Sequence, residues 1–173
     1  MQGARWSGVA VLALWLGHGL TADLATAAEM RPQPAPQAPL KAAASHAAET
    51  SELTGLLSAG QKALDEARYG DAIVNYEKAL AAAGEKDVDA CYAAHVGHGT
   101  ALREKLVRAR REEGFAPAIA DFAAAIALKP REAEGYFERA SAHACSLDYD
   151  AARADIEQGL RLDPKNARGY HLR

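Results

Sequence analysis

The sequence predicts an all-α protein that is built from repeated helical hairpins. Aromatic residues make up only 6% of the 173 residues, whereas alanine is abundant. Alanine is the best helix former, and strands prefer aromatic and β-branched residues. The segments FAPAIADFAAAIALKP at 115–130 and YDAARADIEQGLRLDP at 149–164 place large, small and breaker residues in the same order. They are offset by 34 residues, which indicates a repeated structural unit.

A third copy of the pattern lies upstream, where YGDAIVNYEKAL occupies 69–80. Its offset from the second copy is 46 residues, so the middle unit carries 12 additional residues. Pro130 and Pro164 end the second and third copies, because proline cannot continue a helix interior. The sequence therefore predicts six helices, at 52–67, 70–83, 88–112, 115–128, 132–146 and 149–162.

The pattern A-x3-F-x2-A followed by proline resembles the second helix of a tetratricopeptide repeat (TPR), whose unit is about 34 residues. First helices of that family carry W-x2-L-G-x2-Y, which this chain matches less well. The matching positions are Leu56, Ala59, Gly60 and Ala63; then Ala93, Val96, Gly97 and Thr100, or a frame two residues later around Gly99; then Tyr136, Arg139, Ala140 and His143.

The resemblance implies a right-handed α-solenoid of antiparallel helix hairpins, a TPR-like superhelix. Its domain occupies 52–173, with repeats at about 53–86, 90–130 and 133–166 and a partial capping helix at 167–173. Stacked units share one core because no single unit buries its apolar side alone. We expect the small residues Gly60, Gly97 and Ala140 to let the helices approach closely. The large residues Tyr76, Phe122 and Ile156 are expected to fill the space between neighbouring units.

The N-terminal residues 1–27 have the pattern of a signal peptide. Arg5 supplies the positive region, VAVLALWLGHGL at 9–20 the apolar region, and Ala25-Thr26-Ala27 a small-x-small cleavage site. The alternative is an uncleaved anchor. We expect a periplasmic or secreted protein with no integral membrane segment after cleavage. Residues 28–51 then form a Pro/Ala-rich linker, semi-extended over 30–40, and the folded domain starts near Glu52.

Charge and motifs exclude several classes of function. The net charge is −3 and the pI is near 6.1, which argues against a nucleic-acid partner. No nucleophile elbow, phosphate loop or H-E-x-x-H motif occurs in the chain. We therefore expect a protein that is not an enzyme and needs no cofactor.

One cluster raises the alternative of a metal site. Cys91, His95 and His98 share one side of a predicted helix, and such residues can bind zinc or copper. No fourth ligand is evident, so we expect no metal. Cys91 and Cys145 fall at distant positions of their helices, so we expect no disulfide between them.

The middle unit also carries a basic extension in REKLVRARREEG at 103–114. It is interpreted either as an electrostatic docking spur or as a solvated helix end, where the helix dipole favours cations. Its basic residues are Arg103, Lys105, Arg108, Arg110 and Arg111.

The TPR resemblance implies that a protein or peptide ligand lies on the concave face of the first helices, as an extended or helical segment. Carried over position by position, the partner-binding residues are Leu57, Gln61, Leu64, Ala94, His98, Leu102, Phe137, Ser141 and Arg168. The carboxylate clamp of chaperone-binding members is excluded because its positions hold Leu57, Gln61, His95, Glu134 and Glu138.

These observations predict an exported adaptor that binds a peptide or helix in its concave groove. A self-associating structural module of the cell envelope, joined through an open end near Tyr170, is the alternative and would be a homo-oligomer. A metal-binding protein is the third interpretation. Residues 41–51 are a further candidate, as an internal occupant of the groove.

Overall fold

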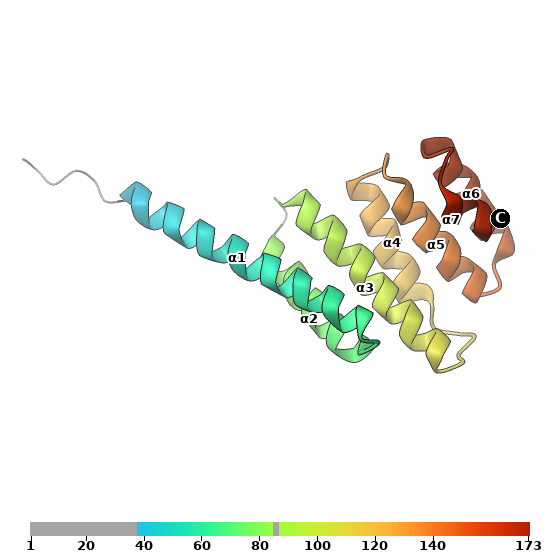
Figure 1. Ribbon diagram of the computed structural model, residues 1–173, viewed down its shortest axis with the longest axis horizontal. Coiled ribbons are helices and arrows are strands. Elements are labelled where there is room, and N and C mark those ends of the chain that lie inside the picture. Colours follow the sequence, from blue (N-terminus) through green and yellow to red (C-terminus); the bar gives the residue numbers. More distant parts are fainter. Residues whose placement is uncertain (1–37, 85–86) are drawn as a thin grey trace, which may run out of the picture. The chain divides into compact units, whose positions relative to one another are not determined.

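The computed structural model describes residues 38–84 and 87–173, with side chains described from Thr50 onward. This part of the chain contains helices and no strand. The helices are α1 (Ala38–Asp65), α2 (Tyr69–Ala83), α3 (Val88–Arg108), α4 (Ala116–Leu128), α5 (Ala133–Cys145), α6 (Tyr149–Leu162) and α7 (Ala167–Leu172), shown in Figure 1. None of the described helices combines the length and apolar character that a membrane span requires.

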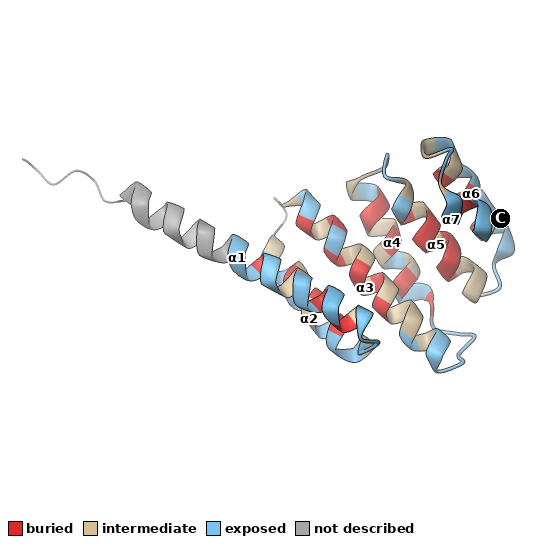
Figure 2. Cartoon of the chain, in the orientation of Figure 1, coloured by how far each residue is buried: buried red, intermediate tan, exposed pale blue. Residues whose placement is uncertain are grey.

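The helices form three antiparallel hairpins, α1–α2, α3–α4 and α5–α6, which stack side by side and end at α7 (Figure 1). Each helix packs against the next one along the chain, and the first helices of successive units also contact one another, α1 with α3 and α3 with α5. Figure 2 shows buried residues along the sides of α3, α4 and α5 that meet their neighbours. The predicted all-α, right-handed solenoid of helix hairpins is confirmed.

Short polar side chains start three of the helices by accepting hydrogen bonds from otherwise unpaired backbone N–H groups. Asp87 Oδ1 accepts from Ala90 N–H at 3.0 Å before α3, and Asp148 Oδ1 accepts from Ala151 N–H at 3.1 Å before α6. Asn166 Oδ1 does the same for the first turn of α7. These side chains therefore fix locally where α3, α6 and α7 begin.

Tyr76 of α2 joins the first two units, as the sequence predicts. It is 3% exposed and lies between Gly60 of α1 and Gly97 of α3. A Cβ atom on Gly97 would stand 2.2 Å from Tyr76 Cζ, and one on Gly60 would stand 2.8 Å from it. Only residues without a side chain fit against the ring on both sides.

Phe122 of α4 is fully buried and packs against Gly99 of α3. Gly99 thus meets the aromatic ring of its own hairpin, as Gly60 meets Tyr76 in the first hairpin. The repeat frame centred on Gly99, two residues later than Gly97, is therefore the one that the fold follows.

Two predicted helix boundaries are wrong. α1 begins at Ala38 rather than at residue 52, so residues 41–51 continue this helix and are not an occupant of the groove. The signal-peptide hypothesis for 1–27 and the first part of the 28–51 linker lie outside the described residues.

α3 ends at Arg108 rather than at residue 112. Arg110 has a positive φ of 53°, and the N–H groups of Arg110 and Arg111 bond back to the carbonyls of Val107 and Leu106. This pair of bonds closes the helix end. The basic extension is therefore helical through Arg108, which makes α3 21 residues long against 13 for α5, and only Arg110 and Arg111 lie in the turn.

Candidate functional site

A groove of about 480 Å³ crosses the first helices of the three hairpins. Half-buried Leu57 and Leu64, together with Gln61, line it from α1. α5 contributes Glu134 and Glu138. The remaining lining residues are Tyr76 of α2 and Tyr92, Ala93, Val96, Gly97 and Thr100 of α3. The wall is thus apolar along α1 and α3 and acidic at α5.

The predicted residues of the first unit lie in this groove. Leu57, Gln61 and Leu64 fall on one side of α1 because they are separated by three or four residues. Gln61 Nε2 donates to Asp65 Oδ1 at 2.9 Å, and Tyr76 Oη lies 3.4 Å from Gln61 Oε1. Gln61 is therefore oriented by its neighbours and leaves hydrogen-bonding capacity toward the groove.

The predicted residues of the second unit, Ala94, His98 and Leu102, do not line the groove. Ala94 is fully buried in the core between α2 and α3, and Leu102 packs against the core formed by Ala118, Phe122 and Ala142. His98 faces α4, where its Nδ1 lies 2.7 Å from Asp121 Oδ2.

These three positions were assigned with the repeat frame centred on Gly97, whereas the fold follows the frame centred on Gly99, two residues later. Each residue turns a helix by about 100°, so two residues turn the side chain by about 200°, to the opposite side. The residues that line the groove are the ones two places later, Val96 instead of Ala94 and Thr100 instead of His98. The sequence does contain a sign of these residues, because the alternative repeat frame around Gly99 places Val96 and Thr100 in the groove.

The predicted residues of the third unit are also placed differently. Phe137 is 1% exposed, because its ring is enclosed by Gly159 of α6 and Gly169 of α7. Ser141 is buried, and its hydroxyl donates to the Phe137 carbonyl at 2.9 Å. Phe137 and Ser141 therefore pack in the core of the third unit and do not line this groove, although Phe137 borders a separate open pocket of about 540 Å³ that Glu134 and Arg168 also line.

Arg168, the remaining predicted residue, forms an ion pair at the acidic end of the groove. Its Nη1 donates to Oε1 of Glu138, and Nη2 of Arg103 lies 3.2 Å from Oε2 of the same carboxylate. Glu138 is 6% exposed and the Arg103 side chain is 12% exposed, whereas the side chain of Arg168 is 42% exposed and remains in contact with water. The hydrogen bond to Glu138 raises the pKa of Arg168, which keeps its positive charge in place.

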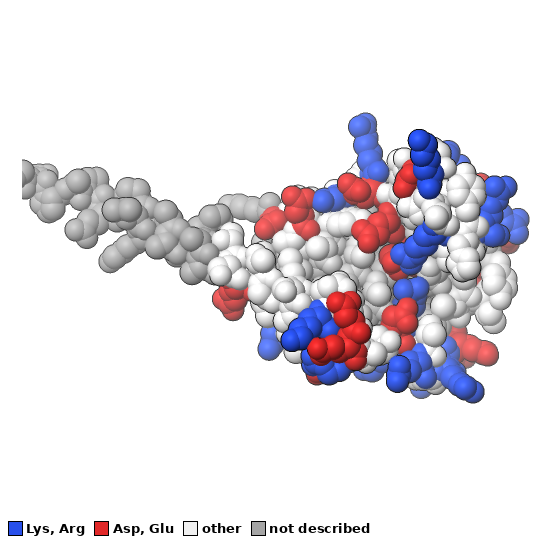
Figure 3. Space-filling model, in the orientation of Figure 1, with Lys and Arg blue, Asp and Glu red and all other residues white. Residues whose placement is uncertain are grey.

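Arg103 belonged to the predicted basic extension, but its side chain is only 12% exposed and points into the molecule. Lys105, Arg108, Arg110 and Arg111 are exposed. In this extension, therefore, Arg103 is part of the packed structure, and the other four basic side chains are in contact with solvent. Figure 3 shows both signs of charge over α5 and α7 rather than a field of one sign.

Tyr92 contributes a phenol to the groove wall. Burial, followed by the negative charge of Glu134, raises the pKa of Tyr92 to about 12. The phenol is therefore neutral at physiological pH, and the groove carries no additional anion there.

The three candidate metal ligands are not brought together. Cys91 Sγ lies 3.2 Å from the carbonyl of Gly84, while Nδ1 of His95 and Nδ1 of His98 both face Asp121 at 3.0 and 2.7 Å. Within 38–84 and 87–173, no three His, Cys, Asp or Glu residues are arranged to hold a metal ion. The hydrogen bond to Asp121 raises the pKa of His98 against the opposing effect of burial.

Solved TPR domains share this fold. The first TPR domain of Spaghetti (RPAP3), bound to the HSP90 peptide SRMEEVD, has a TM-score of 0.56 at 23% identity, over 70% of this chain and 86% of that domain. The TPR domain of Arabidopsis OM64 has a TM-score of 0.62 at 18% identity, over 72% and 93%. The second TPR domain of human RPAP3, in complex with the HSP70 peptide SGPTIEEVD, has a TM-score of 0.59 at 20% identity, over 72% and 93%.

No protein-family model and no curated protein matches the sequence. The structural similarities therefore establish the fold, which is that of a TPR domain. The resemblance stated from the sequence pattern is confirmed at this level.

Proposed function

We propose that this chain is an exported, non-catalytic adaptor that binds a peptide or a helix in the groove of its first helices. The observation that carries the proposal is the groove itself, which is lined by side chains from α1, α3 and α5. Two of the similar TPR domains were solved with peptides. A protein or peptide partner suits this surface better than a nucleic acid, because the chain is acidic overall.

The lining residues indicate the chemistry of the ligand. Leu57, Leu64 and Val96 offer apolar surface, whose burial drives association, and Gln61 and Thr100 offer hydrogen bonds that orient the ligand. Exposed Glu134 adds a negative charge at one end. An amphipathic segment with apolar side chains and a basic residue fits these features.

An acidic C-terminal peptide fits poorly. The two guanidinium groups near the groove, from Arg103 and Arg168, already hold the carboxylate of Glu138. A ligand carboxylate at these guanidinium groups would either lie beside the buried negative charge of Glu138 or take partners from it, and both oppose binding. The ligand is therefore of a different chemical class from the EEVD peptides bound to RPAP3.

The test is selection of binding peptides from a random phage-displayed library, followed by anisotropy titration of the selected peptides with a fluorophore attached. Val96→Glu places a carboxylate at the centre of the groove and is expected to weaken binding by at least about tenfold, or ~1.4 kcal/mol. Val74→Glu is the matched control, because Val74 is 46% exposed on α2 and does not line the groove. This variant is expected to bind like the wild type.

Equal binding by both variants, with helical content unchanged by circular dichroism, would contradict the groove as the binding site. Selected peptides rich in Asp and Glu would contradict the proposed chemistry of the ligand. A selection that yields no peptide above background would contradict peptide binding altogether.

Export is supported by the sequence of residues 1–27. We expect residues 1–40 to direct a fused alkaline phosphatase, which is active only after export, out of the cytoplasm. Leu14→Arg interrupts the apolar stretch and is expected to abolish that activity. N-terminal sequencing of the mature protein then tests cleavage after Ala27, and a retained N-terminus would favour the uncleaved anchor.

A further inference from the structure

A histidine whose side chain is only 14% exposed connects the second hairpin to the first. Nδ1 of His98 on α3 lies 2.7 Å from Oδ2 of Asp121 on α4, within the same hairpin. Its Nε2 lies 3.8 Å from Oε1 of Glu77 on α2, in the preceding hairpin. His95, three residues earlier on α3, occupies the other oxygen of Asp121 at 3.0 Å. α1 and α5 also contact α3, but in the described part of the chain neither contributes an ion pair or a hydrogen bond to His98.

Neutral His98 leaves the contact between the hairpins incomplete. A carboxylate only accepts hydrogen bonds, so the single proton of the neutral ring belongs on Nδ1, which faces Asp121. Nε2 is then an acceptor that faces a second carboxylate, and it is buried without a hydrogen-bond partner among the described residues. A second proton turns Nε2 into a donor toward Glu77. The contact across the boundary is therefore favourable only when His98 carries a positive charge.

The third hairpin has a permanent cation at the same place of the repeat. Asp155 of α6 follows Asp121 of α4 by 34 residues, the length of the repeat. Arg139 of α5 donates to both oxygens of Asp155, at 2.8 and 2.7 Å. His98 takes the place of this arginine in the second hairpin. Arginine stays charged in proteins, whereas histidine changes its charge between about pH 5 and 8, so the cation of the second hairpin is one that titrates.

We propose that His98 and Glu77 form a latch between the first two hairpins that a proton closes, and that its closure strengthens ligand binding in the groove. The groove crosses this boundary, because α1 of the first hairpin and α3 of the second both line it. Tyr76, which precedes Glu77, also lines the groove. Its ring packs on Gly97, which precedes His98. The latch therefore acts beside the packing that places α1 against α3, and its effect on a ligand rests on the proposed function.

The charge of His98 sets the direction of the effect. Below the pKa of folded His98 the imidazolium pairs with Glu77 and the latch is closed. As the pH rises through that pKa the proton leaves and the latch opens. The hydrogen bond to Asp121 raises the pKa of His98, against the opposing effect of burial, so the latch stays closed to a higher pH than a solvated histidine would allow.

The latch itself is tested without a ligand. A double-mutant cycle of Glu77→Gln and His98→Gln, read by urea denaturation, gives the coupling between the two side chains. We expect favourable coupling at about pH 5.5 that is lost at about pH 8, on either side of the histidine titration. Coupling that is absent at the lower pH, or that persists unchanged at the higher pH, would overturn the proposal.

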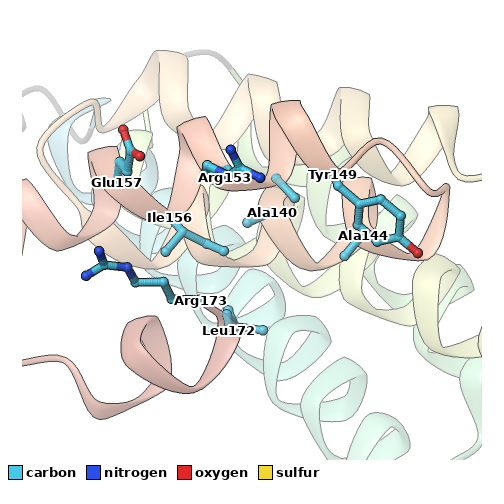
Figure 4. Close-up of a pocket in the computed structure, with 9 residues that line it drawn as sticks. Ala140, Ala144, Tyr149, Arg153, Ile156, Glu157, Leu172 and Arg173 are labelled. Atoms are coloured by element: carbon cyan, nitrogen blue, oxygen red, sulfur yellow. The ribbon is translucent and has the colours of Figure 1, made fainter.

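Glu157 of α6 provides a matched control. It occupies the same place of the repeat as Glu77, directly after the large residue Ile156. Figure 4 shows Glu157 at an open pocket of about 590 Å³ that α5, α6 and α7 form, and the described residues that line this pocket include no histidine. Glu157→Gln removes the same carboxylate and is expected to leave the pH dependence of stability and of binding as in the wild type.

The effect on the ligand is measured with a peptide selected on the groove that contains no histidine, by anisotropy titration at the same two pH values. Glu77 is 60% exposed, so water screens the pair, and we expect binding about two- to fivefold tighter at the lower pH. Glu77→Gln and His98→Gln are expected to remove this difference. His98→Arg copies the cation of the third hairpin and is expected to keep the tighter binding at both pH values.

Two outcomes of the titration would overturn the regulation of the groove. One is a wild-type affinity that does not change with pH, and the other is a pH dependence that survives Glu77→Gln. A selection that yields no peptide contradicts the proposed function instead, and the double-mutant cycle then still decides whether the latch exists.

Discussion

Tyr76 and Phe137 are both aromatic rings enclosed by two glycines, yet they were assigned opposite roles from the sequence. Tyr76 comes from a second helix and lies between Gly60 and Gly97. Phe137 comes from a first helix, at a position that the TPR resemblance assigns to ligand binding, and lies between Gly159 and Gly169. The comparison teaches that the neighbours decide the role of an aromatic residue, because two residues without side chains open a space that the ring fills.

The largest expected effect is on Phe137. Phe137→Ala removes a fully buried ring and is expected to lower the free energy of unfolding by about 3–5 kcal/mol, from lost burial and the cavity left behind. Leu57→Ala, at a half-buried groove residue, is the comparison and is expected to cost about 1 kcal/mol. Urea denaturation followed by circular dichroism measures both. Similar losses in the two variants would show that Phe137 is no more a core residue than Leu57.

The glycines that flank the rings provide the next test. Gly97→Ala would bring a Cβ to 2.2 Å from Tyr76 Cζ, and Gly159→Ala would bring one to 2.5 Å from Phe137 Cε1. Each is expected to destabilise the protein by about 1–3 kcal/mol, because the ring or its helix must move. The same denaturation experiment detects this loss.

Gly55→Ala is the matched control for these two variants. Gly55 lies in α1 with no atom within 4 Å of the position of an added Cβ. Because glycine in a helix interior is less stable than alanine by about 0.5–1 kcal/mol, this variant is expected to gain stability. A loss at Gly55 equal to that at Gly97 would mean that the effect comes from helix propensity and not from the ring.

A smaller effect is expected from pH at the junction that Tyr76 holds together. His98 of α3 faces Asp121 of α4 and, at 3.8 Å, Glu77 of α2, with His95 on the other oxygen of Asp121. The hydrogen bond to Asp121 raises the pKa of folded His98 above its ordinary value of 6.5. The protonated form therefore stabilises the fold, fully below the unfolded-state pKa, and this stabilisation is lost as the pH rises through the folded-state pKa.

We expect the free energy of unfolding to fall over that pH range in the wild type and to change less in Asp121→Asn. Titration of the imidazole proton signals by nuclear magnetic resonance measures the pKa of His98 directly. A His98 pKa at or below 6.5 in the folded wild type would contradict the assignment.

The smallest expected effect is that of Tyr76→Phe. The hydroxyl oxygen of Tyr76 is 3.4 Å from Gln61 Oε1, a long hydrogen bond at the edge of the groove. Its removal keeps the ring between the two glycines and is expected to cost at most about 0.5–1 kcal/mol. A loss as large as that of Phe137→Ala would show that the hydroxyl, and not the ring, holds the first two units together.

The second helices could be predicted from the sequence because their large and small residues alternate in the same way in each copy. Tyr76 and Phe122 are buried as this pattern requires. The first helix of the middle unit was harder to place, because Gly97 and Gly99 both suit a close approach and lie two residues apart. A repeat frame centred on Gly97 predicts that Ala94, His98 and Leu102 face the groove. In the structure these three side chains face away from it.

The carboxylates at the acidic end of the groove, Glu134 and Glu138, could be placed from the repeat pattern, but the ion pairs of Glu138 could not. Arg103, Glu138 and Arg168 come from three different helices and are separated by 30 residues or more. Their contact depends on how the units stack, which a repeat pattern does not specify to within the length of a side chain. The contacts of Phe137 with Gly159 and Gly169 depend on the same stacking.

The contacts that hold α7 have a consequence for hydrogen exchange. Gly169 of α7 packs against Phe137, and Arg168 bonds to Glu138, both on α5. Exchange of an amide hydrogen reports the free energy of local opening. A change on α5 should therefore be detected in α7, and Phe137→Ala is expected to speed amide hydrogen exchange in both helices.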